Sequence, residues 1–278
     1  MYKAFQYKDE LSIFSEEERE KYSDIGKRLY DSQKHTISND LKSFYLKNGV
    51  LNGTKLKESW FPSIEAHVFF SHSHVDKDVA IILAGYLYDK FNIISFIDSN
   101  VWGYANDLLK EIDNKYCKNT ESNTYNYSAR NFSTSHIHMM LNTALMEMID
   151  KTECIIFINT DNSIESLKDT IEHATYSPWI YSELNMIKFM KLNPPKRTLE
   201  KVEKSFGETE KRLFFESLTI GYHVTEELEG LNKLSNKHLV KLSREASREQ
   251  ILKSHYDDSI MPGIVLDSLY SMFKSSYK

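Results

Sequence analysis

The chain has 278 residues, of which 41% are hydrophobic and 27% charged, and its formal net charge is −5. This composition is typical of a globular protein with enough apolar surface for one large domain or two small ones. None of its nine glycines has the spacing of a P-loop or a GxGxxG fingerprint, which need glycine so that backbone N–H groups can approach phosphate. Between residues 64 and 195, 17 acidic side chains outnumber 10 basic ones, the reverse of the basic stripe of a nucleic-acid-binding domain. The sequence therefore excludes a dinucleotide cofactor held by backbone amides and argues against a nucleic-acid partner.

Cysteine content and hydropathy indicate the cellular compartment. Two cysteines, Cys117 and Cys154, are too few for a disulfide framework. The first ten residues lack the apolar core of a signal peptide, and no stretch approaches the ~20 apolar residues of a membrane span. We therefore expect a cytoplasmic protein with no membrane partner.

The first part of the chain has helical periodicity. Ser15 is followed by three glutamates, a pattern typical of an N-cap with an acidic first turn. Apolar residues between 37 and 45 then recur at helical spacing, until Asn48-Gly49 and Asn52-Gly53 break the pattern. These features predict two helices over 11–48, and we interpret residues 1–63 as a helical N-terminal extension.

Strands and helices alternate from residue 64 onward. Apolar runs at 67–71, 93–98 and 153–159 predict buried strands, separated by helices over 76–91 and 104–116 and by one that Ser135 is expected to cap. Continuous apolar runs, in place of alternating ones, are typical of a parallel sheet covered on both faces. The polar stretch 118–134 is interpreted as a surface loop within an insertion around 101–134. The fold class predicted is therefore α/β, with a mostly parallel, doubly wound sheet.

The remaining residues complete the domain prediction. A helix is expected to begin at Ser177-Pro178, because proline suits the first helical turn, and to end at Pro194-Pro195. The runs 213–215 and 218–220 predict one or two more strands, and residues beyond 236 read as helical, with a break at 262–263. We therefore expect an α/β domain over 64–235 and a helical C-terminal extension over 236–278.

Polar loops follow each predicted strand, at 71–74, 98–102 and 159–162. In parallel sheets ligands bind at the carboxyl ends of the strands, so these loops are expected to converge on one edge. Three segments there and beyond resemble the Toll/interleukin-1 receptor (TIR) domain family. They are Phe69-Phe70-Ser71-His72-Ser73 with the Asp76-Lys77 helix start, the second strand ending in Asp98, and Ser177-Pro178-Trp179-Ile180-Tyr181-Ser182-Glu183-Leu184. The resemblance covers roughly residues 66–223.

The resemblance implies a flavodoxin-like fold and, as in bacterial antiphage-defence members, cleavage of the N-glycosidic bond of NAD+. NAD+ is then a substrate and no cofactor is expected. The product is an ADP-ribose or cyclic ADP-ribose-type signal, to which a downstream effector would respond, and the family resemblance also suggests a homo-oligomer. Whether the product is linear or cyclic, and what activates the enzyme, are left open by the sequence.

Site residues follow from the same motifs. The family's catalytic glutamate falls on Glu183, and a carboxylate there suits the chemistry because cleavage of a nicotinamide ribosyl bond generates an oxocarbenium-like sugar. Trp179 lies one helical turn before Glu183 and is expected to bind substrate, either by stacking on a ring or by walling the pocket. Ser71, His72 and Asp98, together with Trp102, are the expected substrate-binding residues. The family usually has a short loop after its second strand, so the insertion here leaves the role of Trp102 open.

Alternative functions also fit the sequence. A TIR-like module that scaffolds partners without activity is compatible with the same motifs, and so is a nucleoside-processing transferase of related fold. His72-x-His74-x-Asp76 matches the start of the HxHxDH zinc motif of metallo-β-lactamase-like hydrolases. Lys77 replaces the last histidine of that motif, and no metal site is therefore expected.

Overall fold

The computed structural model describes residues 1–8, 11–33, 41–46, 50–119, 124–166, 173–190, 193–195, 221–252 and 261–273. A five-stranded parallel sheet forms its centre, in the order β3-β2-β4-β1-β8. Its strands are β1 (Lys3–Tyr7), β2 (Val68–Ser71), β3 (Ser95–Ile97), β4 (Cys154–Ile158) and β8 (Asn232–Leu234). A smaller antiparallel sheet is formed by β5 (Glu165–Ser166), β6 (His173–Thr175) and β7 (Tyr222–His223). The expected α/β class with a parallel central sheet is confirmed.

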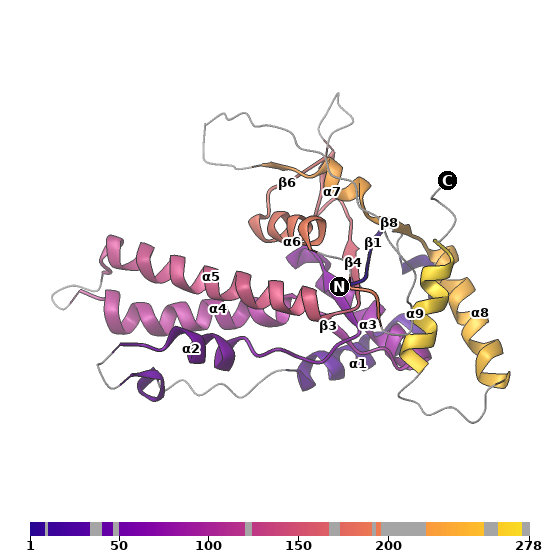
Figure 1. The fold of residues 1–278 in the computed structure, drawn as a ribbon, viewed down its shortest axis with the longest axis horizontal. Helices are drawn as coiled ribbons and strands as arrows, with labels where there is room; N and C mark the ends of the chain where they lie inside the picture. Colours follow the sequence, from indigo (N-terminus) through magenta and orange to yellow (C-terminus); the bar gives the residue numbers. More distant parts are fainter. Residues whose placement is uncertain are drawn as a thin grey trace.

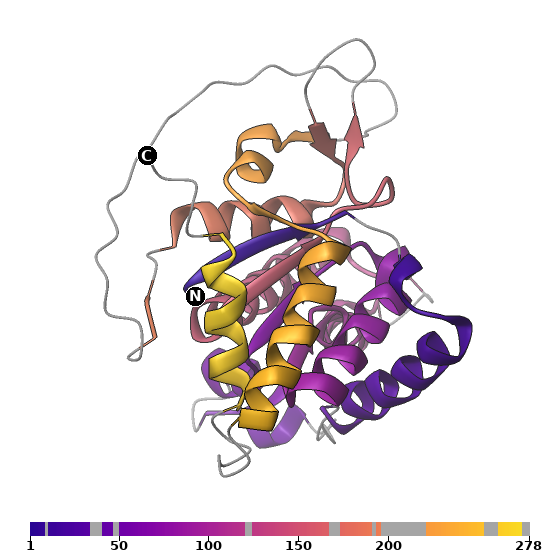
Figure 2. The same ribbon diagram turned by 90° about the vertical axis from the view of Figure 1, so that its right-hand side faces the viewer.

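Helices cover both faces of the central sheet (Figures 1 and 2). One face packs against α1 (Glu16–Ser32), α3 (Lys77–Phe91), α8 (Asn236–Leu252) and α9 (Met261–Ser271). The other packs against α2 (Gly53–Trp60), α4 (Ser99–Ile112), α5 (Tyr127–Lys151), α6 (Pro178–Phe189) and α7 (Thr225–Glu229). Because side chains alternate along a strand, Phe70 and Ile156 face the first layer, whereas Phe69 and Ile155 face the second. Burial on both faces explains the continuous apolar runs in the sequence.

The N-terminal strand corrects the prediction of a purely helical extension over 1–63. β1 lies inside the sheet, with Phe5 opposite Ile156 of β4 on one side and Asn232 of β8 on the other. The order β3-β2-β4 matches the first three positions of a flavodoxin-like sheet, and the N-terminal strand takes the fourth. One sheet therefore contains strands from both sides of residue 64, where a domain boundary was expected. The strands expected at 213–215 and 218–220 lie outside the described residues.

The remaining N-terminal and C-terminal elements that the structure describes are helical. The helix predicted from Ser15 is α1, and its capping box is present: Ser15 Oγ accepts from the backbone N–H of Glu18, whose carboxylate accepts from the backbone N–H of Ser15. In the second predicted helix, the described part is a short 3₁₀ segment, η2 (Leu41–Phe44). The C-terminal helices α8 and α9 pack into the core beside β1 and β8, so they are part of the same body as the sheet.

Two of the nine glycines are explained by the crossing of α1 and α3. A Cβ at Gly26 would overlap the carbonyl oxygen of Ile81, and a Cβ at Gly85 would overlap that of Tyr22. The two helices therefore approach each other through glycine.

Replacing Gly85 with alanine is expected to lower the free energy of unfolding by about 1–3 kcal/mol, because the new methyl group must push the helices apart. The matched control is Gly103→Ala in α4, where an added Cβ meets nothing within 4 Å and helix propensity improves. Chemical denaturation measures both variants. Equal stability of the two would contradict the close helix crossing.

Helices α4 and α5 lie side by side and extend away from the sheet (Figure 1), and we call this pair the arm. The expectation of a loop over 118–134 is wrong for residues 127–134, because α5 begins at Tyr127. Asn126, and not Ser135, caps α5, with its Oδ1 accepting from the backbone N–H of Ala129 at 2.9 Å.

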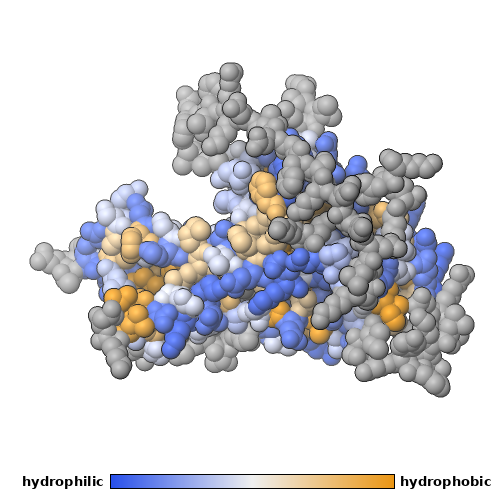
Figure 3. All heavy atoms as spheres, viewed as in Figure 1, coloured by the Kyte–Doolittle hydropathy of each residue, from blue (hydrophilic) through white to orange (hydrophobic). Residues whose placement is uncertain are grey.

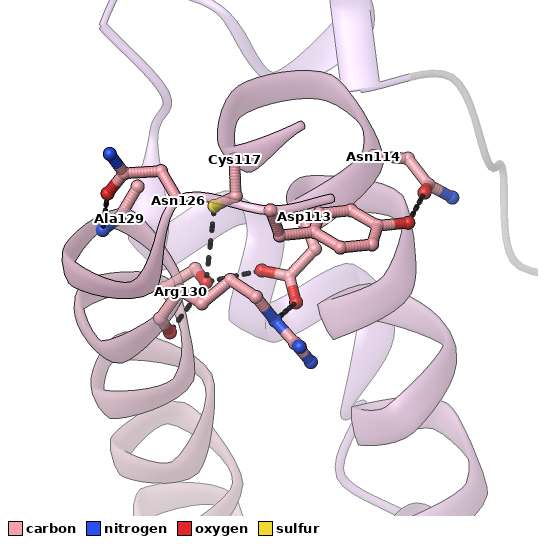
Figure 4. Close-up of polar contacts among 8 residues, drawn as sticks. Asp113, Asn114, Cys117, Asn126, Ala129 and Arg130 are labelled. Carbon is pink, nitrogen blue, oxygen red and sulfur yellow. Dashed lines mark hydrogen bonds and ion pairs between the residues drawn. The ribbon is translucent and has the colours of Figure 1, made fainter. Parts of the chain in front are cut away.

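A buried carboxylate fixes the tip of the arm (Figure 4). Asp113 lies in a π-helical turn, η4 (Asp113–Cys117), which continues from α4. It accepts from Arg130 Nε at 2.8 Å and from Ser133 Oγ at 2.6 Å, both on α5. These bonds tie the ends of the two helices together. Within the part of the chain that the structure describes, no helix has the length and apolar character needed to cross a bilayer.

Candidate active site

The ends of β2 and β3 bring four of the predicted side chains together. Ser71 is the last residue of β2 and His72 follows it, while Asp98 comes directly after β3. Glu183 reaches them from the middle of α6, which Ser177 caps and Pro178 begins. This position lies beside the switch point of the sheet, where β2 pairs with both β3 and β4 and where doubly wound folds bind ligands.

Two short contacts organise this cluster. Ser71 Oγ donates to Glu183 Oε2 at 2.5 Å. His72 Nδ1 lies 2.5 Å from Asp98 Oδ1, and the His72 backbone N–H donates to Asp98 Oδ2 at 3.4 Å. The ring and the carboxylate form an ion pair when the histidine is protonated. Asp98 thus holds His72 through both its ring and its main chain.

All four side chains are completely buried. Ser71, His72, Asp98 and Glu183 each have 0% of their surface exposed. No ligand can touch them unless the surrounding elements move. In this structure the cluster is therefore closed to solvent.

Burial raises the pKa of Glu183 well above its usual value, and the nearby negative charge of Asp98 raises it further. The hydrogen bond from Ser71 favours the carboxylate and opposes these effects, but it is smaller than the desolvation. A hydrogen bond with Asp98 favours the protonated form of the Glu183 carboxyl group and raises its pKa further. Burial therefore favours the protonated form of Glu183 more than water would.

The raised pKa of Glu183 makes the free energy of unfolding depend on pH. Above the ordinary glutamate pKa the unfolded chain releases the proton and the native state keeps it, so the free energy of unfolding falls as pH rises toward the native pKa of Glu183. Glu183→Gln removes this titration, while its amide can still accept from Ser71. Its Tm is expected to exceed that of the wild type by a few degrees at about pH 8 and to equal it near pH 4. Thermal denaturation across this range measures the difference, and Glu20→Gln, an exposed change on α1, is the control. A pH-independent difference would contradict the assignment.

Of the two tryptophans predicted as site residues, the structure describes the side chain of one. Trp179 is half-buried and its ring meets the edge of His138 of α5, with ring centroids 5.4 Å apart. Together with the hydrogen bond from Ser182 Oγ to Asn142 Oδ1 at 2.7 Å, this contact holds α6 against the arm. Trp102 belongs to α4, but its side chain lies outside the described residues.

A second polar network joins the loops after β2 and β4, and the sequence analysis did not foresee its centre. Asp76, which is 5% exposed, accepts from Ser73 Oγ at 2.6 Å, Thr160 Oγ1 at 2.5 Å and Asn162 Nδ2 at 2.9 Å. The expectation that the polar loops converge is therefore confirmed for these two loops. The sequence had placed Asp76 at a helix start and in an incomplete zinc motif, although an acid flanked by hydroxyl-bearing loops is a signal for such a network.

The N-terminal strand contributes a further polar side chain at this edge. Gln6 of β1 accepts from Asn159 Nδ2 at 2.8 Å and donates to the Leu228 carbonyl at 2.6 Å. Sequence reasoning missed Gln6 because it placed residues 1–63 outside the sheet. Among the described residues, no group of three or more His, Cys, Asp or Glu side chains is arranged to hold a metal ion.

The fold and site together define an α/β protein with a buried Ser-His-Asp-Glu cluster at the carboxyl edge of its parallel sheet. Comparison of the chain with family models, curated proteins and solved structures found no significant match.

Proposed function

We propose that this protein is an NAD+-cleaving enzyme, a nucleosidase or cyclase of the TIR type that its motifs resemble. The observation that carries the proposal is Glu183, a completely buried carboxyl group at the carboxyl edge of the parallel sheet, in contact with Ser71 and beside Asp98. Buried carboxyl groups with displaced pKa values cluster at functional sites. We further propose antiphage defence in the cytoplasm as the biological role, on the strength of the resemblance alone.

The chemistry requires one carboxylate. The bond between ribose C1′ and the nicotinamide nitrogen breaks, and its electron pair goes to the nitrogen, which turns the cationic pyridinium into neutral nicotinamide. No general acid is needed for this leaving group. The sugar becomes an oxocarbenium-like cation, which an ionised Glu183 stabilises. Water, or a nucleophile within the ADP-ribose, then forms the new bond at C1′ and loses a proton.

Because the cluster is buried, this mechanism requires the site to open. Substrate must displace the contacts that cover Glu183, and access to solvent then removes the desolvation that keeps this group protonated. Opening and ionisation therefore occur together. Ser71 and His72, which contact Glu183 and Asp98 in the closed state, are placed to orient the ribose when the site opens.

Complete burial of the cluster also favours a second function, that of a TIR-like scaffold without activity. In that case the Ser71–Glu183 contact only stabilises the fold. The two functions differ in turnover, so the purified protein is incubated with NAD+, with free nucleosides and with nucleoside phosphates, each followed by chromatography. The proposal predicts consumption of NAD+ alone. Turnover of free nucleosides would identify a nucleoside transferase instead, and no turnover of any of them would favour the scaffold.

A further inference from the structure

The outer face of α5 carries three exposed apolar side chains at seven-residue intervals. Phe132, Met139 and Met146 are 69%, 61% and 43% exposed, and we call these three residues the stripe. Seven residues make almost two full helical turns, so the three side chains lie in one line along the helix. Figure 3 shows apolar colour over the arm in the same view as Figure 1.

The stripe is not the core-facing side of α5. That side is occupied by Ile137, Leu141, Leu145 and Met148, which are buried in the cluster beneath the sheet. Between residues 131 and 146 the sequence has no Asp, Glu, Lys or Arg. A helix face that stays in water normally carries charged residues. The outer face over this segment therefore presents the three apolar side chains among polar ones that carry no Asp, Glu, Lys or Arg charge.

We propose that the stripe is the contact between two copies of this chain, with their α5 helices packed antiparallel around a two-fold axis at Met139. Met139 is seven residues from both Phe132 and Met146, so this axis places each Phe132 against the partner's Met146 and the two Met139 side chains against each other. A sulfur atom beside an aromatic ring is a favourable contact. The stripe is thus complementary to itself, as a two-fold interface requires.

Charge selects the antiparallel arrangement over the parallel one. Asp150 lies near the C-terminal end of α5, whereas the neighbouring Glu147 is already paired with Lys57 of α2. In a parallel pair Asp150 would lie beside its own copy and repel it. In an antiparallel pair with its axis at Met139, Asp150 lies opposite the first turn of the partner's α5, where the helix dipole favours negative charge.

The exposed area of the stripe supplies less than half of what a stable interface needs. The three stripe residues expose roughly 300 Å² per copy, in the range of the largest apolar patches found on monomeric proteins, which often serve an interaction. A stable interface buries about 800 Å² per partner, and the uncharged polar residues on either side of the stripe supply further contact area. The hydrogen bonds of Asp113 at the tip keep the arm in one shape before the copies meet.

Cross-linking through engineered cysteines tests the geometry. Both native cysteines, Cys117 and Cys154, are buried and do not compete. With oxidised glutathione as the oxidant, Met139→Cys is expected to give mostly disulfide-linked dimer on a non-reducing gel. Phe189→Cys is the matched control, because Phe189 is 67% exposed on α6 outside the stripe. It is expected to remain largely monomeric. Cross-linking of Met139→Cys no higher than that of Phe189→Cys would overturn the proposal.

Mixing of two singly substituted chains tests the direction of packing. Phe132→Cys and Met146→Cys, distinguished by tags of different mass, are expected to form the mixed disulfide in preference to either self-linked dimer. Preferential linkage of like with like would overturn the antiparallel arrangement. Sedimentation of the unmodified protein is expected to show a dimer that Met139→Glu converts to monomer, since the two-fold axis would place two carboxylates together. A wild type that sediments as a monomer at tens of micromolar would also contradict the proposal.

Discussion

Asp98→Ala is expected to lower the free energy of unfolding by about 2–4 kcal/mol, because it removes a buried carboxylate that contacts both the ring and the backbone of His72. Asp98 and His72 are both 0% exposed, and the carboxylate contacts the ring nitrogen and the backbone N–H of His72. Its loss leaves the buried backbone N–H of His72 without this acceptor. For a chain of this length the corresponding decrease in Tm is roughly 10 °C.

Two comparisons identify the cause of that loss. Asp98→Asn keeps an oxygen acceptor for the His72 N–H groups and is expected to lose less stability than the alanine variant. Asp89→Ala removes an exposed pair with Lys21, which is worth under about 1 kcal/mol. Thermal denaturation with circular dichroism measures all three variants. If Asp98→Ala were no less stable than Asp89→Ala, the buried pair would not stabilise the closed site.

Glu183→Gln is expected to reduce nicotinamide release from NAD+ by at least about 100-fold, the usual effect of removing a group that stabilises charge in the transition state. The amide keeps the size of the side chain and can still accept from Ser71, so the fold is retained. Glutamine has no negative charge to place beside the oxocarbenium-like ribose. Turnover is followed by chromatography at equal protein concentration.

The control for this loss is Glu20→Gln, the same chemical change on the exposed face of α1. It is expected to keep wild-type turnover. Wild-type rates in Glu183→Gln, with Tm values that show a folded protein, would assign Glu183 a purely structural role and favour the scaffold.

The strands were predictable because local signals specified them, whereas Glu183 was singled out only by the resemblance to the TIR family. The sequence runs that form β2, β3 and β4 are predominantly apolar, without the alternation of polar and apolar residues that a half-exposed strand has. Each run ends in a polar residue, which the structure places at the carboxyl edge of the sheet. Ser177-Pro178 marked the start of α6 through ordinary capping chemistry, which set the position of Glu183. The convergence of Ser71 and Asp98 follows from the parallel arrangement of their strands, whereas Glu183 reaches them from α6.

The parts that were missed depend on contacts between distant segments. β1 is short, and its place between β4 and β8 is determined by pairing with residues about 150 and 230 positions away in the chain. The start of α5 was missed because residues 124–134 are polar, and Asn126 was not recognised as its N-cap. The position of α6 likewise depends on its contacts with the arm, which no local pattern encodes.

Mass spectrometry of NAD+ incubated with the wild-type protein tests the proposed function most directly. The proposal predicts nicotinamide together with an ADP-ribose or cyclic ADP-ribose product, both absent when Glu183→Gln replaces the wild type. The mass of the second product also distinguishes hydrolysis from cyclisation, because hydrolysis adds one water. NAD+ recovered intact, or the same products from the Glu183→Gln variant, would contradict the assignment of Glu183 as the catalytic carboxylate.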